Sequence, residues 1–151
     1  SGKAIELSEK CFERVPLVYA DQAFYPVAYR WKTQFNENAK TPSFSHAFSE
    51  MNHNELLAFS NRVAPFHAIM LSTNLEHRRV QKRISLTKDI LQKKGVSVTE
   101  INIKGSLLKQ MFTTILLGDL TSYYLALRYE TDPTPVDLIE KFKGDMGPFL
   151  I

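Results

Sequence analysis

Hydrophobic positions along the chain alternate between runs typical of buried strands and stripes typical of amphipathic helices. Three short apolar runs, rich in β-branched or aromatic residues, have the length of buried strands: 15–20, 64–72 and 96–103. Three longer segments place apolar residues three or four positions apart, as helices on a core do: 3–13, 25–39 and 74–94. This alternation predicts an α/β fold, a three-layer α/β/α sandwich in which right-handed βαβ units form a mainly parallel sheet.

The segment that follows Gly105 and Ser106 is predicted to be a long helix that continues to about Arg128. Its residues are apolar most of the way round, whereas a surface helix needs an apolar stripe of only roughly 100°. We therefore expect this helix to be buried in a core or in a subunit interface. A stiff turn at 132–135 then leads to a last short helix from Val136 to Lys143.

Several local predictions follow from the same pattern. Residues 41–52 contain Pro, Ser and Asn and are predicted to form an irregular loop, after which Asn52 or Asn54 caps a short helix. Trp31 is expected in the core, and His67, inside an apolar strand, is expected to be a hydrogen-bonded core or edge histidine. From this short helix, the side chains expected to face inward are Leu56, Leu57 and Phe59. From the helix predicted at 74–94, they are Val80, Ile84, Leu86, Ile90 and Leu91.

Composition describes one ordinary globular domain. The 151 residues are 44% hydrophobic and 23% charged, with no internal repeat. A net charge of +3 does not require nucleic acid as a partner, but it suits an anionic ligand. The single cysteine, Cys11, excludes an internal disulfide framework and favours the cytoplasm, and no apolar run is long enough for a membrane span. The chain opens on Ser-Gly-Lys without methionine, which we interpret as the start of a fragment.

Candidate chemistry is concentrated between Arg30 and Glu55. Glu37 lies between two asparagines, as does His53, and a carboxylate with an imidazole can supply an acid–base pair near neutral pH. The structural alternative is that these asparagines only mark helix ends.

Two further clusters are candidate binding sites. His46, Glu50 and His53 have the spacing of metal ligands on a helix, but the Pro and Ser around them argue against a helix there. The basic residues 77–83 are interpreted as a solvated helix face, with contact to an anion or a subunit as the alternative. The Gly-rich nucleotide-binding motifs GxGxxG and GxxxxGK[ST] are absent from the sequence.

Three segments, KTQFNENAK at 32–40, EMNHNE at 50–55 and DPTPVDLIEKFK at 132–143, resemble the C-terminal domain of the bifunctional phosphoglucose/phosphomannose isomerase family. This family is a branch of the sugar isomerase (SIS) domain superfamily, whose sheet topology is flavodoxin-like, and the resemblance covers nearly the whole chain. It implies that residues 1–151 form one SIS-type domain, the C-terminal half of a two-domain isomerase. The phosphate-binding Ser/Thr loops of the family belong to the N-terminal SIS domain, which this chain lacks, so the isolated domain is expected to be inactive.

The resemblance also implies an activity and a site. The reaction is the interconversion of glucose 6-phosphate, and of mannose 6-phosphate, with fructose 6-phosphate through a cis-enediol, as in glycolysis and gluconeogenesis, and it requires no metal or other cofactor. Glu37 corresponds to the base that moves a proton between C1 and C2, and His53 to the residue that assists ring opening. Lys143 corresponds to a site lysine, with Lys141 as a competitor for that role. The remaining residues expected to bind substrate are Arg30, Asn36, Asn38, Asn54, Thr134 and Lys141.

The resemblance leaves a second class of function open. Some SIS domains bind sugar phosphates in regulators without catalysing a reaction, and a basic domain that binds nucleic acid is a more distant alternative. A carboxylate at position 37 favours the isomerase, because a protein that only binds an anionic sugar phosphate does not need one there. Because SIS sites are built between domains and subunits, His53 is expected to serve the Glu37 of a neighbour. The long helix predicted after Ser106 has more apolar surface than one small sheet can cover, so we also expect a homodimer with Leu120, Tyr123 or Tyr124 near the contact.

Overall fold

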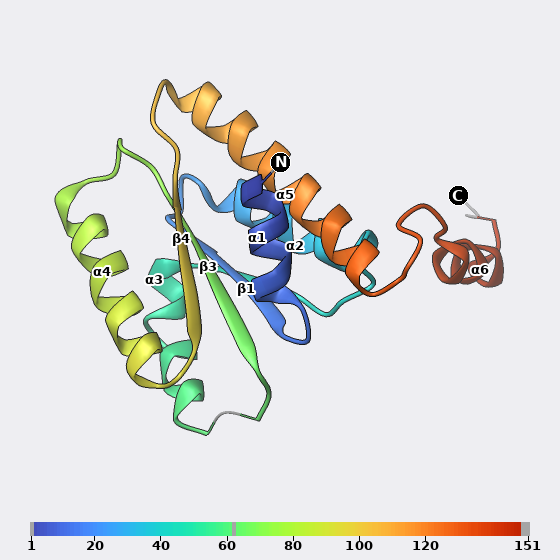
Figure 1. Cartoon of the computed structure of the whole chain (residues 1–151), viewed down its shortest axis with the longest axis horizontal. Coiled ribbons are helices and arrows are strands. Elements are labelled where there is room, and N and C mark those ends of the chain that lie inside the picture. The colour runs from blue at the N-terminus through green and yellow to red at the C-terminus, as the bar shows by residue number, and fades with distance from the viewer. Residues whose placement is uncertain (1, 62, 149–151) are drawn as a thin grey trace.

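The structure, a computed structural model, describes residues 2–61 and 63–148, and these contain four strands, six α-helices and one 3-10 helix (Figure 1). The outermost residues of the predicted domain, 1 and 149–151, lie outside this description. In chain order the elements are α1 (Gly2–Cys11), β1 (Val15–Ala20), α2 (Tyr25–Glu37), β2 (Phe44–Ala47), α3 (Phe48–Met51), η1 (Glu55–Ser60), β3 (Phe66–Ser72), α4 (Arg78–Lys93), β4 (Ser97–Asn102), α5 (Leu107–Arg128) and α6 (Asp137–Met146).

The four strands form one parallel sheet in the order β2-β1-β3-β4. In this register Val18 of β1 lies between Ser45 of β2 and Ile69 of β3. An order that runs outward from β1 in both directions is the flavodoxin-like order. The predicted α/β class and the mainly parallel sheet are therefore confirmed.

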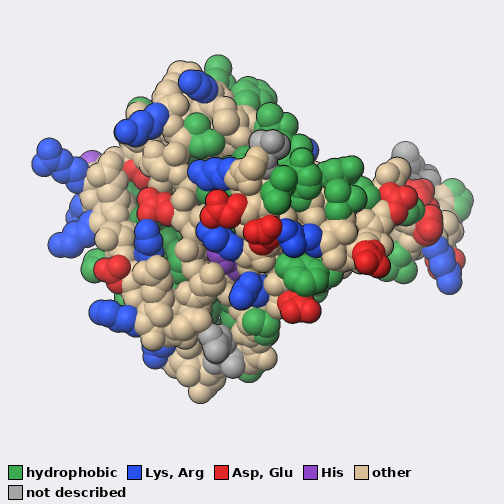
Figure 2. Space-filling view, viewed as in Figure 1, with side chains coloured by type: hydrophobic (Ala, Val, Ile, Leu, Met, Phe, Trp, Pro, Cys, Tyr) green, Lys and Arg blue, Asp and Glu red, His purple; other side chains and the backbone are tan. Residues whose placement is uncertain are grey.

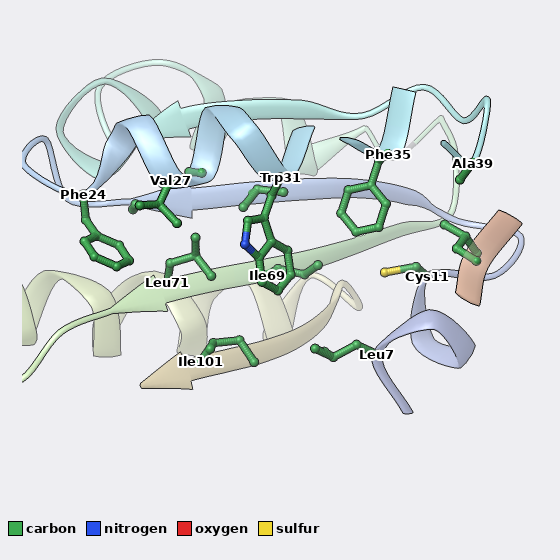
Figure 3. Packing of buried hydrophobic residues seen from close by; sticks show 14 of the residues in the cluster. Leu7, Cys11, Phe24, Val27, Trp31, Phe35, Ala39, Ile69, Leu71 and Ile101 are labelled. Carbon is green, nitrogen blue, oxygen red and sulfur yellow. The ribbon is translucent and has the colours of Figure 1, made fainter. Parts of the chain in front are cut away.

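Helices cover both faces of the sheet, which gives the predicted three layers. On one face, α1, α2 and α5 enclose a core that includes Trp31, Phe35 and Ile69 (Figure 3). On the other face, α3, η1 and α4 enclose a second core around Tyr19 and Met70. The core position predicted for Trp31 is confirmed, since its side chain is fully buried.

The irregular loop predicted at 41–52 is wrong for residues 44–51. Residues 44–47 form the edge strand β2, and 48–51 form one turn of helix. Ser45 and His46 give this strand no apolar run, so its sequence carries no strand pattern. It forms because β1 offers a partner along its whole length, and because Ser43 Oγ donates a 2.8 Å hydrogen bond to Pro16 O beside it.

The helix predicted after Ser106 is buried on one side only within the described chain, so the core of this domain does not enclose its outer face, and burial of that face in a subunit interface stays a prediction. The buried face of α5 is mostly small or polar, with Thr114, Gly118 and Ser122 among its residues. Its large apolar side chains point outward instead: Leu107, Leu108, Phe112, Leu116, Tyr123 and Leu127 are exposed. The reason is that α5 packs on α1 and α2, where close approach of helices favours small side chains.

Three of the side chains predicted to face inward are exposed. Leu57 of η1 is 76% exposed, and Leu86 and Ile90 of α4 are 52% and 37% exposed. α4 buries only a narrow stripe that contains Ile84, Thr87 and Leu91, because it covers two strands at one side of a small sheet. The apolar periodicity predicted this helix correctly, but it predicted a wider buried face than the one observed.

His67 is buried in β3, and only one of its ring nitrogens has a partner. Nδ1 lies 2.9 Å from Ser97 Oγ, whereas Nε2 has no hydrogen-bond partner among the described residues. The predicted core position is confirmed, but the ring is only half satisfied. Burial, together with the charges of Lys10 and Arg14, lowers the pKa of His67 to about 4.

Gly118 gives a test of the packing between α2 and α5. A Cβ atom at this position would lie 2.4 Å from Nε1 of Trp31. We expect Gly118→Ala to lower the free energy of unfolding by about 1–3 kcal/mol, because the clash outweighs the better helix propensity of alanine. Chemical denaturation measures this change. Gly144→Ala is the control, because a Cβ there meets no atom within 4 Å; equal stability of the two variants would contradict the close packing.

His67 predicts a pH dependence of stability. Its pKa in the folded protein, about 4, is below the ordinary value of 6.5, so the unfolded chain binds more protons between these values. The stabilisation is complete above pH 6.5 and is lost as the pH falls towards 4. We expect His67→Gln to reduce the loss of stability between pH 7 and pH 5 by about 2 kcal/mol. Urea unfolding at both pH values measures it, and identical pH dependence in both proteins would refute it.

Candidate functional site

Glu37 is the last residue of α2, and its side chain is exposed. The asparagines beside it are both engaged in structure. Asn36 Nδ2 donates to Thr41 O at 2.9 Å, and Asn38 Nδ2 donates to Ser122 Oγ of α5 at 2.9 Å. The neighbouring amides therefore fix the end of α2 and leave the carboxylate of Glu37 facing outward.

Lys40 links the end of α2 to the turn that precedes α6. Its ammonium group donates to Glu37 O at 2.6 Å and to Pro133 O at 3.3 Å. In that turn, Asp132 Oδ1 accepts a 2.8 Å hydrogen bond from the amide of Thr134, whose side chain is exposed. The structure thus brings the predicted residues Glu37 and Thr134 to the same end of the domain.

His53 belongs to the segment between α3 and η1, and its ring is exposed. Asn54 occupies the N-cap position of η1, as predicted, but its side chain donates to Glu50 Oε1 at 2.6 Å and does not cap the helix. Asn52 Nδ2 donates to Thr87 Oγ1 of α4 at 2.9 Å.

Glu37 and His53 lie on opposite faces of the sheet. α2, which ends at Glu37, packs into the core that contains Trp31 and Phe35, whereas Met51 and Leu56 on either side of His53 pack into the core around Tyr19. A single sugar cannot touch both side chains across a sheet and its two packed cores. Within one copy of the domain, the structure therefore does not assemble Glu37 and His53 into one site.

Lys141 and Lys143 are on α6, which stands away from the rest of the domain (Figure 1). No residue of this helix is buried, and the apolar side chains of Leu138 and Phe142 are exposed. Lys143 Nζ donates to Glu140 Oε1 within the same helix at 2.8 Å. The position of either lysine in a site thus depends on what α6 packs against.

Arg30 is placed away from Glu37. Its guanidinium donates to Asp119 Oδ2 of α5 at 3.1 Å, so it ties α2 to α5 at the surface. Among the described residues, no group of three or more His, Cys, Asp or Glu side chains could hold a metal ion. His46 and Glu50, grouped with His53 from their spacing, have separate partners in Glu55 and Asn54.

A groove of about 420 Å³ lies beside Asn52, between the segment that carries His53 and α4. Arg79, Lys82 and Arg83 line it, and Arg83 Nη1 donates to Asn52 Oδ1 at 3.1 Å. None of these three cations forms an ion pair with a described carboxylate. The groove beside Asn52 is therefore positively charged, which suits an anionic ligand.

Comparison with known proteins identifies the family. The model of the bacterial phospho-glucose isomerase C-terminal SIS domain matches residues 1–146. The chain belongs to this family. It is 38% identical to the bifunctional phosphoglucose/phosphomannose isomerase of Thermoplasma volcanium over 136 residues, which cover 89% of the chain and 44% of that protein. It is 36% identical to the enzyme of the same name from Caldicellulosiruptor bescii, over 95% of the chain and 44% of that protein.

The SIS-domain chain therefore spans less than half the length of these curated relatives. A solved structure with the same fold is the putative phosphosugar isomerase involved in capsule formation from Bacteroides fragilis. It has a TM-score of 0.67 at 14% identity, and the match covers 93% of this chain and 83% of that one. No described helix is long and apolar enough to cross a membrane.

Sequence reasoning did not bring together Tyr19, His46 and Glu55, three polar side chains that meet next to the segment carrying His53. Tyr19 Oη donates to Glu55 Oε1 at 2.5 Å, and His46 Nδ1 lies 3.1 Å from Glu55 Oε2. Tyr19 is separated from Glu55 by 36 positions, and it lies in an apolar run that predicts only a strand. The adjacency of His53 and Glu55 was visible in the sequence, but the pairing of β1 with β2 that creates their surroundings was not.

Proposed function

We propose that the protein is the C-terminal SIS domain of a phosphoglucose/phosphomannose isomerase. Its substrates would be glucose 6-phosphate, mannose 6-phosphate and fructose 6-phosphate. The observation that carries the proposal is the family match over residues 1–146, within which the two side chains proposed for proton transfer, Glu37 and His53, are both exposed. Cys11 is buried and unpaired, and burial raises the pKa of its thiol to about 12, which fits an inert thiol in a cytoplasmic enzyme of glycolysis and gluconeogenesis.

In this proposal Glu37 is the base. Its carboxylate removes a proton from C2 of the open-chain aldose and returns it to C1 of the cis-enediol, while the hydroxyl proton of O2 passes to O1, which gives the ketose. His53 moves the proton that opens the sugar ring, and Lys143 or Lys141 polarises the ring or carbonyl oxygen. Asn36, Asn38, Asn54, Thr134 and Arg30 are proposed to bind substrate or to hold its surroundings. No step in this scheme calls for a metal or another cofactor.

The placement of Glu37 and His53 on opposite faces of the sheet favours a site that is completed by a second copy. In an assembly that brings the α3 and η1 side of one copy against the end of α2 of another, the His53 of one copy can face the Glu37 of its neighbour. The exposed helix α6 can then pack on the second copy, which brings Lys141 and Lys143 to the same site. The relatives are about twice as long as this chain, so we propose that an N-terminal SIS domain supplies the phosphate contacts.

The other candidate is a regulatory SIS domain that binds a sugar phosphate without turnover. The basic groove beside Asn52 supports binding of an anion, which both candidates require. Glu37 distinguishes them, because an exposed carboxylate at the end of α2 weakens the binding of an anion and is useful only for proton transfer.

Glu37→Gln tests the assignment of the base. The amide has the shape of the carboxylate but cannot accept the proton, so we expect isomerase turnover in the full-length protein to fall at least about 100-fold. Binding of fructose 6-phosphate, measured by calorimetry, should stay within about threefold. Glu13→Gln, an exposed carboxylate beside α1, is the control. Unchanged turnover in Glu37→Gln would remove Glu37 from the mechanism.

The proposed homodimer can be tested at the outer face of α5, which is the side that the described part of the chain leaves exposed. The exposed apolar residues of α5 lie four or seven positions apart and therefore form one row along the helix: Leu108, Phe112, Leu116, Tyr123 and Leu127. Hydrophobic side chains gather over α5 in Figure 2. Leu120 and Tyr124, predicted near the contact, lie beside this row and are half-buried. We propose that a second copy covers the row.

We expect a dimer in sedimentation velocity at micromolar concentration, and we expect Phe112→Glu to dissociate it, because a carboxylate in an apolar interface loses its hydration. Phe44→Glu is the matched control. Phe44 is 59% exposed, like the 68% of Phe112, but it lies on strand β2 away from α5. A monomeric wild-type protein, or a dimer that survives Phe112→Glu, would exclude this interface.

A further inference from the structure

The side chains on either side of His53 are held by hydrogen bonds, whereas the ring of His53 is not. Asn52 contacts Thr87 of α4, and Asn54 contacts Glu50 at the end of α3. Within residues 2–61 and 63–148, the ring of His53 takes part in no hydrogen bond or ion pair. The hydrogen bonds of Asn52 and Asn54 therefore hold the backbone of this segment in place, while the imidazole of His53 stays free to contact a ligand.

Glu55 makes the strongest of these attachments, because one carboxylate reaches two strands. Its Oε1 accepts the hydrogen bond of Tyr19 on the central strand β1 at 2.5 Å. Its Oε2 lies 3.1 Å from Nδ1 of His46 on the edge strand β2. The first turn of η1, two residues after His53, is thereby tied to the sheet itself.

Local structure alone would not hold this segment. η1 is a 3-10 helix of six residues, a type that is rarely stable beyond one turn, and its N-cap Asn54 makes no side-chain cap hydrogen bond. Leu57 and Ala58 are exposed, so Phe59 is the buried residue of η1, and it lies near the far end. Without Glu55, the end of η1 next to His53 would be attached to the sheet only through the half-buried side chain of Leu56, which packs on the core around Tyr19.

The buried hydroxyl of Tyr19 requires a hydrogen-bond acceptor, which Glu55 provides. The side chain of Tyr19 is only 1% exposed, and burial and the nearby carboxylate of Glu55 raise the pKa of its hydroxyl, which therefore remains protonated and can donate. A buried donor without an acceptor is costly, so the position of Tyr19 in the core dictates where the carboxylate must lie. The core around β1 is thus coupled to the position of His53.

We propose that Glu55 is a positioning residue, which binds Tyr19 and His46 together and so fixes the segment that carries His53. Glu55 acts through His53 and does not touch the sugar. The catalytic consequence rests on the role proposed above for His53 in phosphosugar isomerisation, whereas the structural consequence does not.

Amide hydrogen exchange in the full-length protein tests the structural part. In Glu55→Ala, exchange of residues 52–59 should accelerate about tenfold or more, while exchange of β1 and β3 stays unchanged. Glu55→Gln retains an acceptor for Tyr19 and should accelerate exchange less. Tyr19→Phe, which deletes only the donor, loosens the same residues by a second route should Glu55→Ala fail to fold. Glu6→Ala, which removes an exposed carboxylate bonded to Lys10, is the control. Unchanged exchange of 52–59 in Glu55→Ala and Tyr19→Phe would overturn the proposal.

Steady-state kinetics tests the catalytic part. Glu55→Ala should lower kcat about 10–100-fold with KM within about threefold, and Glu55→Gln should recover part of this loss. If exchange accelerates but kcat does not change, Glu55 does not position His53 for the reaction and the proposal fails. If the wild-type protein turns over no phosphosugar, the proposed function fails instead, and the exchange data still decide whether Glu55 holds the segment.

Discussion

The contact between Trp31 of α2 and Gly118 of α5 sets the arrangement of the helices on one face of the sheet. The indole is fully buried, and its Nε1 donates to Thr114 O at 2.8 Å, so a single side chain both fills the space between the helices and satisfies a backbone carbonyl. The approach is so close that α5 must turn small and polar residues inward. Its large apolar residues are consequently left on the outside.

That geometry connects the fold to the proposed assembly. A helix that presents Phe112 and Leu116 to solvent has apolar surface which the described part of the chain does not cover. α6 is in the same situation, because none of its residues is buried. These two uncovered elements, together with a Glu37 and a His53 on opposite faces of the sheet, support the proposal that another copy or another domain completes the site.

The two cores have different consequences for the site. The core around Trp31 fixes the end of α2, where Asn38 bonds to Ser122 and leaves Glu37 exposed. The core around Tyr19 fixes the segment after α3, where Glu55 takes the hydroxyl of Tyr19 and leaves His53 exposed. In both places, polar neighbours are used for structure so that one ionisable side chain remains available. In the proposed mechanism, chemistry and packing are therefore divided between adjacent residues of the same short segment.

The sequence by itself determined the elements with strong periodicity, the parallel α/β architecture and the segments that resemble the isomerase family, because apolar spacing and short motifs are local properties. It could not determine β2, whose four residues become a strand only beside β1, or the outward face of α5, which depends on the indole of Trp31 about ninety positions earlier in the chain. The separation of Glu37 from His53 was likewise decided by tertiary structure. A spacing of sixteen residues does not say on which face of a sheet each side chain emerges, since that depends on how the intervening strand pairs.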